Sequence, residues 1–273
     1  SEYGNPRAGG IIAINLEAED RLLAVKVTDG TKHIFLATAE GMVEACRKAG
    51  NGFWVHENWR WQGPIREFAR ELREPLMGKC FRARMTFSCS FPVFDNQPFL
   101  READRFILAD IGSHLLDTAR FLFGEARSLW CRTARVNRSI RGEDVATVLM
   151  ETGRGTAVTC EMSYASRLAD ERFPQTFLLA ECEGGSVELG PDYALRVTDG
   201  RGTRSRAVPP PHYAWADPAY DVVHASIVGC NRDLLSALRG ESPGETTGED
   251  NLRTVRIVFG AYESAATGRV VTP

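Results

Sequence analysis

The middle of the chain alternates between hydrophobic and polar residues in the manner of β-strands. Short apolar runs recur from about residue 128 to residue 207, and in residues 145–150 every second side chain would point to the same face of a strand. Gly184 and Gly185 separate two such runs, which predicts a β-hairpin. This part of the chain is therefore expected to form a sheet of mostly antiparallel strands.

Apolar residues at helical spacing flank this region on both sides. Leu115, Ala119 and Leu122 fall on one side of such a stretch, and Gly124 is expected to end it. The predicted helices are residues 42–48, 64–72, 113–123, 222–238 and 249–266, the predicted strands are residues 53–56 and 80–88, and residues 91–105 are expected to form a loop. This order predicts an α+β fold, in which a large, mostly antiparallel sheet carries helices on one face.

Residues 9–38 are expected to form a separate segment of short strands. One apolar run begins at Ile11 and a second at Leu22. Asp29-Gly30 is a strong hairpin signal before a third run that ends at Leu36. A short segment rich in β-hairpins is therefore predicted to precede the large sheet.

Composition and charge exclude several kinds of protein. The 273 residues carry a formal net charge of −3, so no excess of positive charge points to nucleic acid or to an anionic membrane. No apolar run approaches the roughly 18 residues of a membrane span, and the first residues lack the basic-then-apolar pattern of a signal peptide. The seven cysteines lie far apart without a paired spacing, which predicts free thiols, no metal site and a cytoplasmic protein.

The candidate chemistry lies at the start of the predicted helix 113–123. Asp110 precedes this helix and His114 falls in its first turn, so the four-residue spacing directs both side chains to one side of the helix entrance. A carboxylate beside an imidazole orients the ring and stabilises its protonated form, which suits the histidine for general acid–base catalysis. A second interpretation stays open, in which Asp110 caps the helix and His114 is a partly buried structural residue.

The stretch from Asp110 to Gly124 resembles the D-x-G-x-H-x-x-D-x-x-R-x-x-x-G signature of the Gfo/Idh/MocA oxidoreductases. Three further segments resemble parts of the same family in the same order, namely residues 42–61, 76–84 and 248–269. By this resemblance, residues 43–273 are similar to the family's C-terminal domain for substrate binding and oligomerisation.

This resemblance implies a dehydrogenase that acts on a CH–OH group of a sugar, a polyol or a related compound, with NAD or NADP as the cofactor. It implies that His114 is the catalytic acid/base and that Asp110 is its catalytic partner. Arg60 and Glu57, which follow a predicted strand, would bind the substrate.

The same resemblance bears on structure and assembly. Asp117 and Arg120 would face the other way on the helix and form a structural ion pair, and Trp59 and Trp61 are expected to pack rather than to stack on a sugar. The large sheet would be available for pairing with a second copy of the chain, which predicts a homo-oligomer. No membrane partner and no nucleic-acid partner is expected.

The nucleotide-binding part of that family is not recognisable in this sequence. Its G-x-G-x-x-G fingerprint, whose backbone amides bind a pyrophosphate, does not occur. Ala37-Thr38-Ala39 stands where the family's Glu-Lys-Pro motif is expected, so its catalytic lysine is absent as well. These observations predict that the cofactor site is not present in this chain and that the chain is incomplete for catalysis. A non-catalytic module for sugar binding or oligomerisation is the alternative.

Residues 1–42 resemble one blade of the DNA-wrapping C-terminal pinwheel of the gyrase A subunit, on residues 3–16 and 29–42. This resemblance implies a chimeric chain with two segments, residues 1–42 and 43–273, and adds a DNA-associated protein as a further alternative. The charges of the first segment oppose DNA binding, because its four cationic side chains are outnumbered by six acidic ones.

Overall fold

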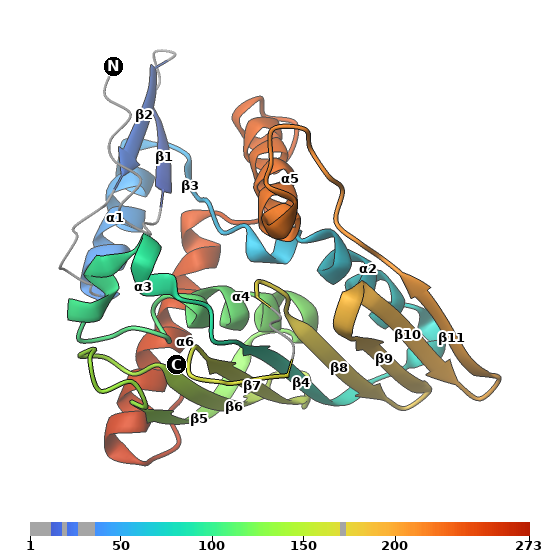
Figure 1. Ribbon diagram of the computed structural model, residues 1–273. Helices are drawn as coiled ribbons and strands as arrows, with labels where there is room; N and C mark the ends of the chain where they lie inside the picture. Colours follow the sequence, from blue (N-terminus) through green and yellow to red (C-terminus); the bar gives the residue numbers. More distant parts are fainter. Residues whose placement is uncertain (1–11, 18–20, 27–35, 170–172) are drawn as a thin grey trace.

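The computed structural model describes residues 12–17, 21–26, 36–169 and 173–273. Its largest element is an eight-stranded sheet with the strand order β11-β10-β9-β8-β4-β7-β6-β5 (Figure 1). The strands are β4 (Cys80–Ser88), β5 (Ala126–Ala134), β6 (Val145–Thr152), β7 (Ala157–Ser163), β8 (Phe177–Cys182), β9 (Gly185–Leu189), β10 (Ala194–Asp199) and β11 (Gly202–Ala207). Every neighbouring pair is antiparallel except β4 and β7. The prediction of a large, mostly antiparallel sheet is confirmed.

The alternation of the sequence decides which face of this sheet is buried. In β6 the side chains of Ala146, Val148 and Met150 are buried. Leu149, between them, is 46% exposed. The hairpin predicted around Gly184 is present as β8 and β9. Because every second position is apolar, the sheet offers one hydrophobic face for helices to cover.

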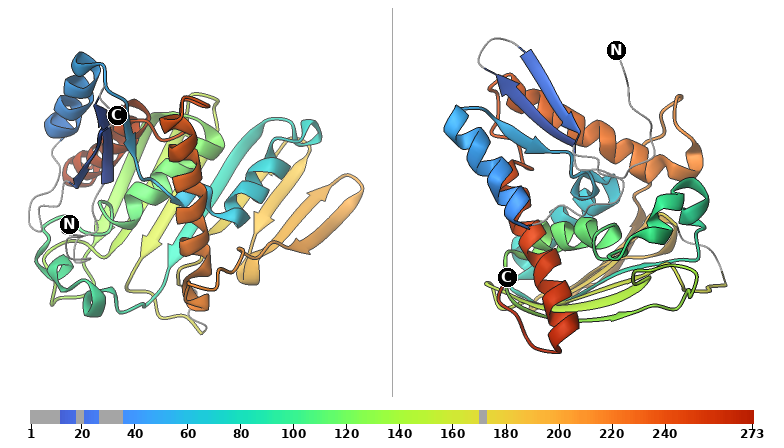
Figure 2. Two further views of the ribbon diagram at one scale, coloured as in Figure 1. Left: turned by 90° about the horizontal axis from the view of Figure 1, so that it is seen from above. Right: turned by 90° about the vertical axis from the view of Figure 1, so that its left-hand side faces the viewer.

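The helices lie mainly on one side of this sheet, as two further views show (Figure 2). They are α1 (Leu36–Ala49), α2 (Gly63–Leu72), α3 (Val93–Asn96), α4 (Ile111–Phe123), α5 (Asp221–Leu238) and α6 (Gly248–Thr267), with the 3₁₀ turns η1 (Trp59–Trp61), η2 (Pro75–Met77), η3 (Pro98–Glu102), η4 (Pro191–Tyr193) and η5 (Pro218–Tyr220). α4 packs against β4 and β7 in the middle of the sheet, and α6 packs against β5 at its edge. The predicted α+β fold is confirmed. Within the described ranges, no helix has the length and apolar character needed to cross a membrane.

Two local predictions were wrong. The first helix begins at Leu36 rather than at residue 42, because alanine is the strongest helix former and Ala37 and Ala39 extend the helix upstream. The predicted loop 91–105 contains α3 and η3. Pro98 starts η3, at a position where a helix does not need the N–H group that proline lacks. The hairpin predicted at Asp29-Gly30 lies outside the described residues.

The N-terminal strands belong to a second sheet. β1 (Ile12–Glu17) and β2 (Arg21–Lys26) form three antiparallel strands with β3 (Phe53–Val55), in the order β2-β1-β3. The two strands predicted at these positions are therefore present. Ala13 of β1 lies opposite Val55 of β3, so residues on both sides of position 42 share one sheet. β3 leads directly to Glu57.

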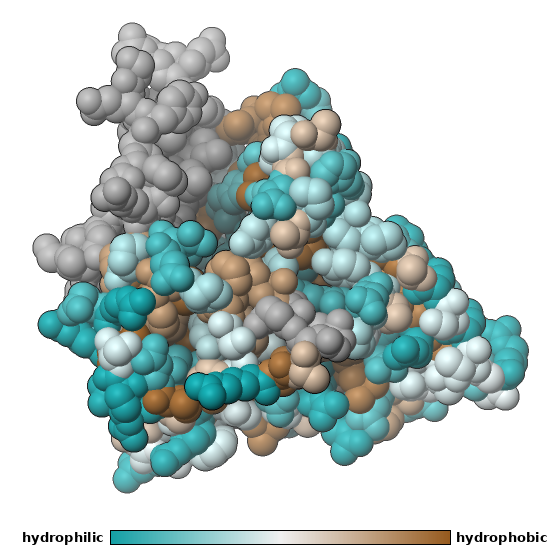
Figure 3. Space-filling view, viewed as in Figure 1, coloured by the Kyte–Doolittle hydropathy of each residue, from teal (hydrophilic) through white to brown (hydrophobic). Residues whose placement is uncertain are grey.

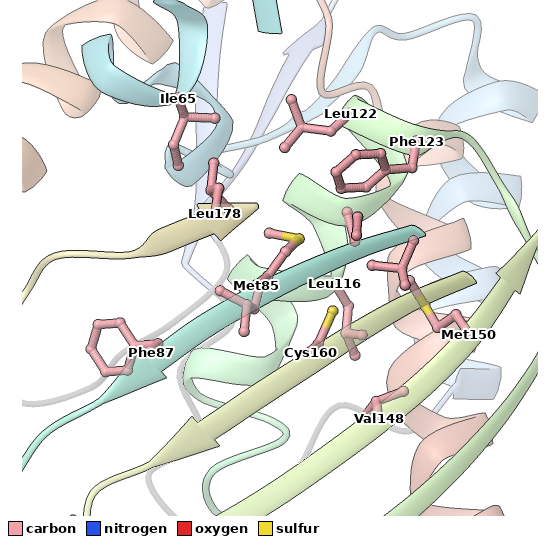
Figure 4. Packing of buried hydrophobic residues seen from close by; sticks show 14 of the residues in the cluster. Ile65, Met85, Phe87, Leu116, Leu122, Phe123, Val148, Met150, Cys160 and Leu178 are labelled. Carbon is pink, nitrogen blue, oxygen red and sulfur yellow. The ribbon is translucent and has the colours of Figure 1, made fainter. Parts of the chain in front are cut away.

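The main core lies between the large sheet and the helices. Met85 from β4, Cys160 from β7 and Leu116 from α4 point toward one another there (Figure 4). All three side chains are fully buried. Close packing of this kind fixes α4 against the sheet, and with it the first turn that carries His114.

Ile65 on α2 is fully buried in the same core and provides a test of its packing. Ile65→Val removes one methyl group and is expected to lower the free energy of unfolding by about 0.5–1.5 kcal/mol. Chemical denaturation followed by tryptophan fluorescence measures the change. Val136→Ala is the control, because Val136 is 59% exposed, and its effect is expected to stay within about 0.5 kcal/mol. Equal effects in the two variants would contradict the tight packing of Ile65.

Candidate active site

Two glycines set the position of α4. Gly112 in its first turn lies against β7, where a side chain would come within 3.2 Å of the sulfur of Met162 and 3.3 Å of the carbonyl oxygen of Ile107. At the other end, Gly124 has a φ of 96°, which a residue with a side chain rarely adopts, and the helix ends there. Gly112 therefore allows α4 to pack closely on β7, and Gly124 allows the helix to end. Neither glycine has a chemical role, so the candidate chemistry of this stretch lies in its polar residues.

His114 and Glu57 form a hydrogen-bonded pair. Nδ1 of His114 lies 2.7 Å from Oε1 of Glu57 and 3.0 Å from Oε2. Glu57 is buried, and its Oε1 also accepts the backbone N–H of Trp59 at 3.0 Å. The side chain of His114 is 28% exposed, so part of the imidazole stays accessible. Two residues predicted from the sequence are thus brought together, and the carboxylate that contacts the imidazole is Glu57.

Burial and charge act in opposite directions on this pair. Burial disfavours the imidazolium, but the charge and hydrogen bond of Glu57, together with the charge of Asp110, raise the pKa of His114 above its ordinary value. Burial also disfavours the carboxylate, but the charge and hydrogen bond of His114 and the N–H of Trp59 lower the pKa of Glu57. The result is a proton-binding group whose charged form is stabilised at a site that solvent can reach.

Asp110 stands at the N-terminus of α4 but makes no capping hydrogen bond with its side chain. Its Oδ2 accepts a hydrogen bond from the hydroxyl of Tyr164 at 3.3 Å. Burial raises the pKa of Asp110, while the charge of His114 and the bond from Tyr164 act in the other direction. The helix-cap interpretation of Asp110 is therefore wrong, and the influence of Asp110 on His114 is electrostatic.

Arg60 lies in a buried ion cluster. Its Nε and Nη2 donate to Asp117 at 2.6 and 2.5 Å, and Nη2 also donates to Asp250 at 2.9 Å. Arg120 is 3.5 Å from Asp117 and 3.0 Å from Asp250. The predicted ion pair between Asp117 and Arg120 is therefore confirmed. Burial disfavours the charge of Arg60, but the carboxylate of Asp117 outweighs it and raises the pKa of Arg60. Substrate binding by Arg60 and Glu57 stays a prediction.

Other contributors to the site were not assigned from the sequence. Tyr164 follows β7 and Thr176 precedes β8, and both strands pair with β4. This pairing carries the two residues to the site, where Tyr164 bonds Asp110 and Thr176 bonds the indole of Trp59. Neither position has a local sequence signal. Trp59 is buried as predicted, but its ring also stacks on that of His114.

The space-filling view shows apolar side chains gathered near the centre of this face, below α5 (Figure 3). A separate pocket is lined by residues of α6 and of the C-terminal segment, together with Arg105. In the described ranges, no group of histidine, cysteine, aspartate and glutamate residues is placed to hold a metal ion. Cys46, Cys80, Cys131, Cys160, Cys182 and Cys230 are free thiols.

The fold is similar to that of solved oxidoreductases. A solved oxidoreductase from Agrobacterium radiobacter, in complex with NAD⁺, L-tartaric acid and magnesium, matches this chain with a TM-score of 0.85 and 38% identity. The match covers 87% of this chain and 69% of that chain. The family model of the GFO/IDH/MocA C-terminal domain matches residues 65–187.

Two curated relatives are D-apiose dehydrogenases. The one from Paraburkholderia graminis is 43% identical over 236 residues, which cover 86% of this chain and 63% of the relative. The one from Rhizobium rhizogenes is 38% identical over 236 residues, which cover 86% of this chain and 68% of the relative. The chain belongs to the Gfo/Idh/MocA family, as its motifs predicted. It spans 63% and 68% of the lengths of these two relatives.

Short matches to gyrase A subunits accompany these long ones. The subunit from Haemophilus influenzae is 46% identical over 43 residues, and one from Buchnera aphidicola is 51% identical over 43 residues. Each match covers 16% of this chain and 5% of the gyrase subunit. The chimeric origin of the chain and the division at residue 42 stay predictions.

Proposed function

We propose that this chain is the substrate domain of an NAD(P)-dependent dehydrogenase that acts on a CH–OH group of a sugar or polyol. The observation that supports this most is the partly exposed His114, whose Nδ1 is bonded to the buried carboxylate of Glu57. Such a pair can exchange a proton with a bound alcohol. D-apiose is the first candidate substrate, because two D-apiose dehydrogenases are 43% and 38% identical to the chain.

The proposed role of His114 is to remove the proton of the reacting hydroxyl. Oxidation of an alcohol takes a hydride from carbon and a proton from oxygen. Because Glu57 occupies Nδ1, Nε2 is the nitrogen that would accept this proton. The imidazolium that results lies beside Glu57 and in the field of Asp110, and both charges stabilise it. Asp110, with Tyr164 bonded to one oxygen, would support His114 near the hydroxyls of the sugar.

NAD or NADP would supply the hydride acceptor in this reaction. The Agrobacterium oxidoreductase was solved with NAD⁺. In the part of this chain that the structure describes, no glycine-rich turn leads from a strand into the N-terminus of a helix. The residues of the site are therefore assigned to the sugar side of the reaction alone.

Calorimetric titration of D-apiose into the purified protein tests this proposal. Saturable binding is expected, and His114→Ala is expected to weaken it by about 10- to 100-fold, because a hydrogen bond to a charged group contributes about 1.5–3 kcal/mol. His212→Ala is the matched control, since His212 also pairs with a carboxylate, that of Asp221, but is exposed and distant in sequence. Unchanged affinity in His114→Ala would contradict the proposal.

We also propose that the outer face of the large sheet joins two copies of the chain. Trp130 on β5 and Leu149 on β6 lie opposite each other and are 38% and 46% exposed. Exposed apolar side chains that gather on one sheet face are typical of association surfaces. The ion pair between Arg82 and Glu181 lies on neighbouring strands of the same sheet and adds polar contacts.

Light scattering coupled to size-exclusion chromatography measures this association. The unmodified protein is expected to have the mass of two or more chains, and Leu149→Asp is expected to shift it toward the mass of one chain. Leu235→Asp on α5 is the control, because Leu235 is 45% exposed but lies outside the sheet. A single-chain mass for the unmodified protein would contradict the proposal.

A further inference from the structure

The ring of His114 is held from two directions by the short segment that follows β3. Glu57 binds Nδ1 through both carboxylate oxygens, at 2.7 and 3.0 Å. The indole of Trp59 stacks on the imidazole with 4.8 Å between ring centroids and an angle of 20° between the planes. One contact fixes an edge of the ring and the other fixes its plane.

Trp59 is itself locked in place. Its Nε1–H donates to Oγ1 of Thr176 at 3.0 Å, and its backbone N–H donates to Glu57 at 3.0 Å. Its ring meets Phe87 edge-on, with 6.0 Å between centroids. Trp59, Glu57 and Thr176 are all buried, so the stack has little freedom to reorganise.

We propose that Trp59 and Glu57 are positioning residues that hold His114 in one ring orientation and in the tautomer with its proton on Nδ1. The benefit of this positioning for catalysis rests on the proposed acid/base function of His114. The positioning of the ring does not depend on that function. Among the described residues none is hydrogen-bonded to Nε2, so this nitrogen is left to meet a substrate hydroxyl. A base held in this way needs no reorientation when the sugar binds.

Several charged groups face His114 and together set its protonation. Glu57 and His56 belong to the segment at the end of β3, Asp110 directly precedes α4, and Asp117 belongs to α4. The face of an indole attracts a cation through its quadrupole, so Trp59 also favours the imidazolium. Loss of Glu57 removes the largest charge that stabilises the imidazolium, and loss of the aromatic face of Trp59 removes a weaker quadrupole attraction.

Imidazole NMR of the full chain tests the positioning, because nitrogen chemical shifts report the tautomer and a pH titration reports the pKa of His114. In the unmodified protein we expect the Nδ1–H tautomer and a raised pKa. Glu57→Gln keeps the shape of the side chain but is expected to lower the pKa of His114 and to give a mixture of tautomers. Trp59→Leu is also expected to lower the pKa of His114, but by less than Glu57→Gln does. Trp59→Phe keeps an aromatic face, so its pKa for His114 is expected to stay close to that of the unmodified protein.

Trp61→Leu is the matched control, because Trp61 lies on the same turn but stacks on Arg66 instead of His114. It is expected to leave the tautomer and the titration of His114 unchanged. If Glu57→Gln and Trp59→Leu fold but leave the tautomer and the pKa of His114 as they are in the unmodified protein, the inference is overturned. If the NMR changes occur while D-apiose fails to bind, the positioning stands and the proposed function fails.

Discussion

Asp117→Ala is expected to lower the free energy of unfolding by about 3–5 kcal/mol. Asp117 is fully buried and accepts hydrogen bonds from Nε and Nη2 of Arg60 and from the hydroxyl of Thr254. Without it, the guanidinium of Arg60 stays buried and shares the remaining carboxylate of Asp250 with Arg120. The large effect comes from this uncompensated buried charge rather than from the ion pair itself. Urea denaturation measures the change.

Glu44→Ala is the control for this variant. Glu44 pairs with Arg47 at 2.8 Å, but both side chains are exposed, so solvent screens the interaction. We expect the free energy of unfolding to be nearly unchanged. Asp117→Asn, which keeps the shape and part of the hydrogen bonding, is expected to fall between the two. A similar small effect for Asp117→Ala and Glu44→Ala would show that the buried cluster does not stabilise the fold as described.

When a nucleotide-binding domain of the family is supplied to this chain, His114→Ala is expected to reduce NAD⁺-dependent oxidation of D-apiose by about a hundred- to ten-thousand-fold, the usual contribution of a general base. Oxidation requires the neutral imidazole, and Glu57 raises the pKa of His114. The rate of oxidation should therefore rise with pH through that raised pKa, and the rise should move to lower pH in Glu57→Gln. Steady-state rates of NADH formation across a pH series measure both effects.

Two results would count against this assignment. A rate in His114→Ala equal to that of the unmodified protein would remove His114 from the chemistry. Saturable sugar binding without any turnover, even when the nucleotide-binding domain is supplied, would instead favour the non-catalytic binding module. His212→Ala is again the control, because its imidazole pairs with Asp221 rather than with Glu57 and its loss should leave the rate unchanged.

Local spacing was sufficient to predict the helix that carries the site. The apolar stripe and the closing glycine defined α4, and the four-residue spacing placed Asp110 and His114 at its entrance. The ion pair between Asp117 and Arg120, which the family resemblance implied, joins residues three positions apart on the same helix. These features belong to a single helix and the residue before it, where the helical period determines which side chains share a face.

Contacts between distant segments could not be predicted in this way. The sequence placed Asp110 beside the imidazole, but the hydrogen-bonded carboxylate is that of Glu57, 57 positions upstream of His114. Tyr164 reaches Asp110 only because β7 pairs with β4 in one particular register. Strand register depends on the whole buried face of a sheet, so no short motif encodes it. Asp250 likewise joins Arg60 only through the packing of α6 on α4.

A crystal structure of the protein with D-apiose tests the central claim most directly. If His114 is the proton acceptor of a sugar-binding site, a hydroxyl oxygen of the sugar will lie about 2.6–3.2 Å from its Nε2, with Nδ1 still bonded to Glu57. A sugar bound elsewhere, for example in the pocket beside Arg105 and α6, with nothing near Nε2 of His114, would contradict the claim.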